Sequence, residues 1–129
     1  MSDAQRATAQ AVFTAMNTAG LAWQVFQHVP EDTPPPVNII GDMDGTPMDV
    51  KDGTDEQIDL TITTVFQGES RKPVLDEQAK IIAALHDQAL TSVAGWTIHP
   101  MRDSSGAVLM PDGETYLGTL NLTIFALKN

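Results

Sequence analysis

The sequence predicts an α+β domain in which two helices pack on one face of a mainly antiparallel sheet of four to five strands. Three observations predict it. Apolar residues recur at helical spacing in two segments, they alternate with polar residues in others, and glycines and prolines separate the segments. With 129 residues and 42% hydrophobic content, the chain suits one domain over 1–129, because two halves would be too small for stable cores. The predicted order is α-β-β-β-α-β-β.

The two predicted helices have recognisable ends. Ser2 or Asp3 can cap the first helix, which runs to about Ala19 and stops at Gly20. The second helix begins near Pro73, because proline suits the first helical turn, and runs to about residue 89. Its apolar stripe is predicted to comprise Leu75, Gln78, Ala79, Ile81, Ile82, Leu85 and Ala89.

Five strands are predicted, over residues 23–29, 37–41, 58–67, 96–102 and 115–127. The clearest is 58–67, in which Ile58, Leu60 and Ile62 alternate with polar residues. Three successive prolines at 34–36 make the connection before the second strand rigid. A loop is predicted after the fourth strand, containing Ser104-Ser105-Gly106. The inward residues of the last strand are predicted to be Gly118, Leu120, Leu122, Ile124 and Ala126.

An acidic loop is predicted between the second and third strands. It is expected to project from the domain, because unpaired charges are costly to desolvate. Its carboxylates are Asp42, Asp44, Asp49, Asp52 and Asp55. The loop begins like a calcium-binding loop, but Thr46 and Pro47 stand where a ligand and a glycine are needed, and Gly53 replaces the closing glutamate. No metal site is predicted here.

The sequence contains no motif that is typical of a catalytic or metal site. The chain has no cysteine, which excludes disulfides, thiolate chemistry and Cys-ligated zinc. His28, His86 and His99 have no metal-ligand spacing, and neither a nucleophile elbow nor a phosphate-binding glycine loop occurs. We therefore expect no catalytic residue, no metal, no cofactor and no enzymatic activity.

The net charge and the hydropathy of the chain argue against nucleic acid and membrane as binding partners. The formal charge is −10, from 17 acidic and 7 basic residues, and such a surface disfavours DNA or RNA as a ligand. No apolar run is long enough to span a bilayer, and the N-terminus lacks the pattern of a signal peptide, so no membrane partner is expected.

Four stretches, in the same order along the chain, resemble one family. They are residues 25–34 with His28 before Val29-Pro30, the lead into the clearest strand at 53–62, the second helix at 81–90, and the Asp112-Gly113 turn into the last strand at 112–120. Together they resemble the phage tail terminators, or tail-completion proteins, of siphophages and gene transfer agents.

The resemblance implies a homo-hexameric ring that caps a completed tail tube and joins it to the head. The implied partners are other copies of the chain, the tail tube protein and head–tail connector or adaptor proteins. DNA would pass through without being specifically bound. The implied location is the tail of a virion or phage-like particle assembled in the bacterial cytoplasm, with no cofactor. The alternatives are a tail-tube or head–tail adaptor subunit, and a monomeric protein-binding module.

The resemblance gives two sets of residues an expected role, the outward apolar residues of the last strand and a group of carboxylates. Leu117, Phe125 and Leu127 face away from the core of the last strand, so we expect a neighbouring subunit or tube protein to cover them. The excess negative charge predicts an acidic ring lumen that repels the passing duplex. The carboxylates proposed to contribute are Asp59, Glu69, Asp76 and Glu77. The alternative is that this charge only keeps the protein soluble.

Overall fold

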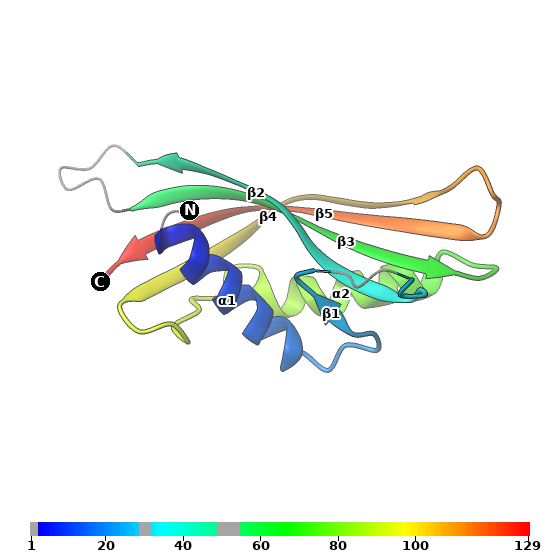
Figure 1. Cartoon of the computed structure of the whole chain (residues 1–129), viewed down its shortest axis with the longest axis horizontal. Helices are drawn as coiled ribbons and strands as arrows, with labels where there is room; N and C mark the ends of the chain where they lie inside the picture. Colours follow the sequence, from blue (N-terminus) through cyan, green and yellow to red (C-terminus); the bar gives the residue numbers. More distant parts are fainter. Residues whose placement is uncertain (1–2, 29–31, 49–54) are drawn as a thin grey trace.

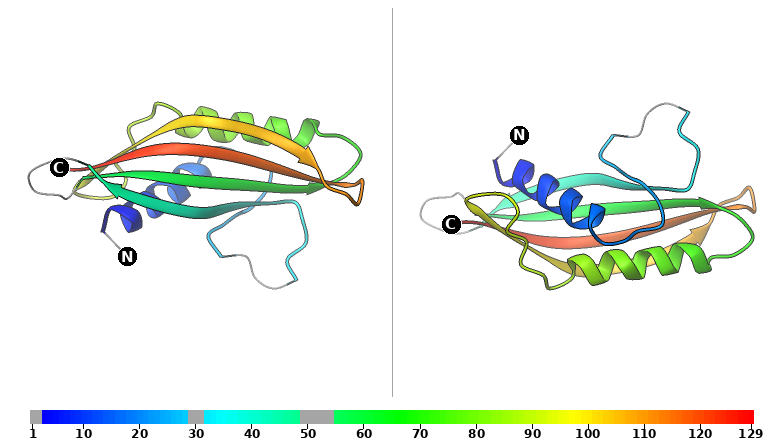
Figure 2. Two further views of the ribbon diagram at one scale, coloured as in Figure 1. Left: turned by 90° about the horizontal axis from the view of Figure 1, so that it is seen from above. Right: turned by 90° about the horizontal axis from the view of Figure 1, so that it is seen from below.

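The computed structural model describes residues 3–28, 32–48 and 55–129. These form two layers, a twisted sheet and a pair of helices that both cover the same face of it (Figures 1 and 2). In chain order the elements are α1 (Asp3–Asn17), β1 (Val25–Phe26), β2 (Val37–Pro47), β3 (Glu56–Gln67), α2 (Lys72–Leu85), β4 (Trp96–Leu109) and β5 (Thr115–Lys128). The predicted fold class and element order are confirmed.

The sheet has the strand order β1-β2-β3-β5-β4. Four of these strands pair antiparallel, as neighbours joined by turns usually do, and the two-residue β1 pairs parallel with β2. The sheet is therefore mixed rather than purely antiparallel. The last strand lies inside it, between β3 and β4, so both of its edges are hydrogen-bonded.

The core lies between the sheet and the helices. In β3 and β5 every second residue is buried, and pairs such as Ile58–Ile124, Leu60–Leu122 and Ile62–Leu120 face each other across the two strands. Burying one such side chain stabilises the fold by about 1.5–3 kcal/mol. The alternation predicted for both strands is confirmed.

Two strands are longer than the sequence indicates. β2 continues to Pro47 through half of the predicted acidic loop, with an irregularity between Ile40 and Met43. β4 continues to Leu109 through the predicted Ser104-Ser105-Gly106 loop, with another irregularity between Arg102 and Ser104. In both cases the long partner strand supplies a complete ladder, and a bulge absorbs the extra residue. Tertiary pairing thus overrides the local preference of these residues for turns.

The predicted first strand is too long. Only Val25–Phe26 pairs with β2, while Trp23 precedes it and stacks on Phe66 with ring centroids 5.2 Å apart. Val29, which the prediction included, lies outside the described residues.

Both helices end earlier than predicted, and α2 is rotated. α1 ends at Asn17, and α2 ends at Leu85 before the extended His86. Its buried face consists of Val74, Glu77, Gln78, Ile81 and Leu85. The predicted stripe is wrong for Leu75, Ala79 and Ala89, which are exposed. Neither described helix has the length and hydropathy needed to cross a membrane.

Candidate assembly surfaces

The face of the sheet opposite the helices has no layer packed on it among the described residues (Figure 2, left). Its centre is polar, with a row of side chains hydrogen-bonded across three strands. The Thr61 hydroxyl donates to Asn121 Oδ1 at 3.0 Å, and Asn121 Nδ2 donates to Ser104 Oγ at 2.9 Å. We call this surface the open face. The polar side chains at its centre are hydrogen-bonded to one another, as on an ordinary protein surface.

Apolar side chains occupy both ends of the open face. Leu117 lies between Val65 of β3 and Val108 of β4 at the end near the β4–β5 turn. Phe125 and Leu127 lie near the other end of β5, and all three predicted interface residues are half-buried within one copy. Leu117 and Phe125 are eight positions apart, or about 27 Å at roughly 3.4 Å per residue. The structure therefore brings Phe125 and Leu127 together and places Leu117 in a separate patch.

The five aspartates of the predicted acidic loop do not form one loop. Asp42 and Asp44 belong to β2, where Asp44 stands directly opposite Asp59 of β3, so for these two the prediction is wrong. The ladder resumes after the irregularity, in which Asp42 lies, and β3 pairs with β2 from Met43 to Pro47. Asp55 precedes β3 and accepts a hydrogen bond from the Lys128 N–H at 2.8 Å. Asp49 and Asp52 lie outside the described residues.

A buried carboxylate is the residue that sequence reasoning placed wrongly. Glu77 was proposed for an acidic lumen, but it is 1% exposed and points into the domain. Its Oε1 accepts the N–H of Ala22 at 2.9 Å, and its Oε2 accepts the N–H of Trp23 at 3.0 Å and Asn38 Nδ2 at 2.7 Å. A buried carboxylate needs such donors, because an unpaired one would be costly to desolvate. Glu77 therefore cannot line a lumen.

The Glu77 contacts extend into a network. Asn38 Oδ1 accepts the Thr64 hydroxyl at 2.7 Å, and both side chains are at most 1% exposed. The network joins α2, the α1–β1 connection, β2 and β3 through neutral donors. A signal for it exists in the sequence: Glu77 lies at helical spacing between Val74 and Ile81, where an apolar residue would be expected.

The turn between β4 and β5 is held in one shape by Asp112. Its Oδ1 accepts the N–H groups of Glu114 and Thr115 at 2.9 and 2.8 Å, and its Oδ2 accepts the Thr115 hydroxyl at 2.5 Å. The Thr115 hydroxyl first, and then the two N–H groups, hold the pKa of Asp112 below its ordinary value. Gly113 has φ +75°, a conformation that favours glycine. The turn is therefore ordered and negatively charged at neutral pH.

His86 and His99 take structural positions. His86 Nδ1 accepts the Arg102 N–H at 2.9 Å, and His99 Nε2 lies 2.8 Å from Asp87 Oδ1. Within residues 3–28, 32–48 and 55–129, no group of three or more His, Asp or Glu side chains could hold a metal ion. These contacts connect the end of α2 to the edge strand β4.

Comparisons with known proteins show the family of the chain and a solved structure of similar fold. A family model described as "Tail completion protein gp17" matches residues 4–126. Among solved structures, a chain of the "Virion of native gene transfer agent (GTA) particle" is similar, with a TM-score of 0.70 and 15% identity over 95% of this chain and 92% of that chain. A comparison with curated proteins found no match.

The chain belongs to the tail completion protein gp17 family, because the match covers nearly all of it. It is thus a structural protein of a phage-type tail, and its role in a virion or phage-like particle involves other tail or head proteins. The resemblance inferred from the four sequence stretches is confirmed.

Proposed function

We propose that this chain is a tail terminator, which forms a hexameric ring, caps the completed tail tube and joins it to the head. Family membership over residues 4–126 carries the proposal. In this proposal the chain acts by presenting surfaces to other subunits, and the buried carboxylate Glu77 has a structural role, because it accepts the N–H groups of Ala22 and Trp23.

The open face supports the assembly reading. Apolar side chains grouped on a solvent-facing sheet surface favour a contact with another protein. The Leu117 patch and the Phe125–Leu127 patch differ in composition and position. Two unlike patches suit contacts with two unlike surfaces, as in a head-to-tail ring or a ring stacked on a tube. We propose that neighbouring subunits or tube protein cover them.

The net negative charge of the chain suits a ring through which DNA passes without binding. We propose that the ring lumen is acidic and that Asp59, Glu69 and Asp76 contribute to it, since all three are exposed and Glu77 is not. Negative walls would repel phosphates within a Debye length of roughly 8 Å and release no counterions to the duplex. The remaining acidic-loop residues, Asp49, Asp52 and Asp55, are proposed to contact an adjacent ring.

Replacing Phe125 with aspartate tests the open-face interface. We expect Phe125→Asp to remain folded, because the side chain is half-exposed, and to lose assembly, because a charge would be desolvated in the contact. The measurements are light scattering for the oligomer and thermal unfolding for the fold. Thr119→Asp is the matched control, on the same strand and face but in the polar centre. Equal assembly of Phe125→Asp and wild type would exclude this patch from any subunit contact.

A further inference from the structure

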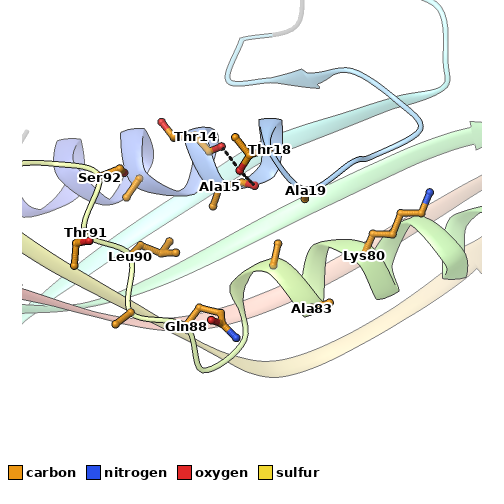
Figure 3. A pocket seen from close by; sticks show the side chains of 13 residues that line it. Thr14, Ala15, Thr18, Ala19, Lys80, Ala83, Gln88, Leu90, Thr91 and Ser92 are labelled. Atoms are coloured by element: carbon orange, nitrogen blue, oxygen red, sulfur yellow. Dashed lines mark hydrogen bonds between the residues drawn. The ribbon is translucent and has the colours of Figure 1, made fainter.

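A groove runs between the two helices on the side of the molecule away from the open face. Its walls are the C-terminal half of α1, the C-terminal half of α2 and residues 88–92, and its volume is about 690 Å³ (Figure 3). Small side chains, including Ala15, Ala19 and Ala83, keep it open. Lys80 is the one charged residue among the described residues that line it, and no described residue forms an ion pair with it. The groove is thus lined by alanines and small polar side chains, with Leu90 as its one large apolar residue and Lys80 as its one cation among the described residues.

The β4–β5 turn carries the complementary features. Val108, Leu109 and Met110 are 61%, 41% and 37% exposed, which makes three of the four large exposed hydrophobic residues in the described part of the chain consecutive. Residues 103–116 contain Asp103, Asp112 and Glu114 and no lysine or arginine. The hydrogen bonds of Asp112 hold this turn in one shape, so little conformational entropy is lost when it is bound. We call residues 108–114 the hairpin tip.

The tip cannot fill the groove of its own copy. It lies at one end of the long axis, past the start of α2, whereas the groove lies between the helices nearer the middle (Figures 1 and 2). We infer that the hairpin tip of one copy inserts into the α1–α2 groove of the next copy, with Val108, Leu109 and Met110 against the alanines and the acidic turn near Lys80. The occupant is a second copy because this chain itself presents an apolar, acidic and preformed projection.

Such a contact joins two different surfaces, so it is heterologous and repeats from copy to copy. A heterologous contact closes into a ring when its rotation allows. The inference rests on the proposed function, to which it adds a second contact between copies of the chain, beside the one proposed for the Phe125–Leu127 patch. It also explains why a groove lined by small residues stays open beside a well-packed core.

Cysteine cross-linking tests the contact directly, because the natural chain has no cysteine. One copy carries Met110→Cys in the tip and a second, tagged copy carries Ala83→Cys in the groove. The control pair combines Met110→Cys with Thr119→Cys, which lies half-exposed in the polar centre of the open face. We expect the mixed disulfide of the tip–groove pair to form at least about tenfold faster than that of the control pair, because binding raises the local thiol concentration. Adding Lys80→Glu to the groove copy should reduce this preference.

Light scattering on the same wild-type protein separates the two claims. Selective tip–groove cross-linking supports the contact, whatever the size of the assembly. Oligomers that form without selective cross-linking overturn the contact and leave the terminator proposal standing. A strict monomer without selective cross-linking counts against both.

Discussion

Replacing Glu77 with leucine lowers the free energy of unfolding by about 4 kcal/mol, because three hydrogen-bond donors lose their acceptor together. Leucine approximates the shape of glutamate without an acceptor, so the N–H groups of Ala22 and Trp23 lose their acceptor, and Asn38 Nδ2 keeps only its longer bond to the Trp23 carbonyl oxygen at 3.3 Å. Glu77→Gln should cost about 2 kcal/mol, because its one oxygen cannot serve all three donors and its amide must face at least one of them. Chemical denaturation measures both values.

The matched control is Asp76→Asn on the same helix. Asp76 is exposed and pairs with Lys72 at 2.8 Å, a surface i,i+4 contact worth only about 0.3–0.5 kcal/mol. Hydrogen exchange gives a second readout, since the Ala22 and Trp23 amides should lose protection in the Glu77 variants before the β3–β5 ladder does. A loss for Glu77→Leu no larger than for Asp76→Asn would contradict the role assigned to the network.

Replacing Gly118 with valine lowers the free energy of unfolding by about 3 kcal/mol through overpacking. A Cβ at this position would lie 2.6 Å from Val74 Cγ1 and 2.8 Å from Gln78 Nε2. Val74 is fully buried and stiff, and Gln78 is held by its 2.9 Å hydrogen bond to the Gly106 carbonyl. Helix α2 must therefore move off β5 to admit any side chain. Chemical denaturation measures the loss.

Gly106→Ala is the control, because a Cβ there meets no atom within 4 Å and should change stability by less than about 0.5 kcal/mol. A double-mutant cycle with Val74→Ala adds a sharper test. Gly118→Ala should cost clearly less in the Val74→Ala background, where its methyl group has room. Strictly additive effects of the two substitutions would show that Val74 does not create the restriction.

The parts of the fold that the sequence predicts well are those where burial alternates strongly. In β3 and β5 apolar residues recur at every second position, which predicts which face of the strand points into the core, and that face is buried in the structure. In helix α2 the predicted stripe is right for Gln78, Ile81 and Leu85, but it omits the buried Val74 and Glu77. Leu75 and Val74 compete for the core at that point, and Gly118 of β5 decides for Val74, which is a long-range contact that local periodicity does not contain.

The lengths of β2 and β4 also differ between the sequence-based prediction and the structure. Asp44, like Ser104 and Gly106, has weak strand preference, yet a neighbouring strand pairs with each of the three, and Asp42 lies in the irregularity before Asp44. In the candidate surfaces, the outward direction of side chains such as Phe125 is predicted by the alternation of inward and outward residues along the strand. The spacing of Glu77 signals that it is buried, but its partners, the groove and the projecting tip depend on how distant segments meet, which no local pattern predicts.

The central claim is ring formation, and electron microscopy of the purified chain tests it most directly. The account predicts closed, hexameric rings with a central opening, formed by the chain alone at high concentration or on the ends of tail tubes. Individual copies with a single-chain mass in both conditions, with no density on tube ends, would contradict it.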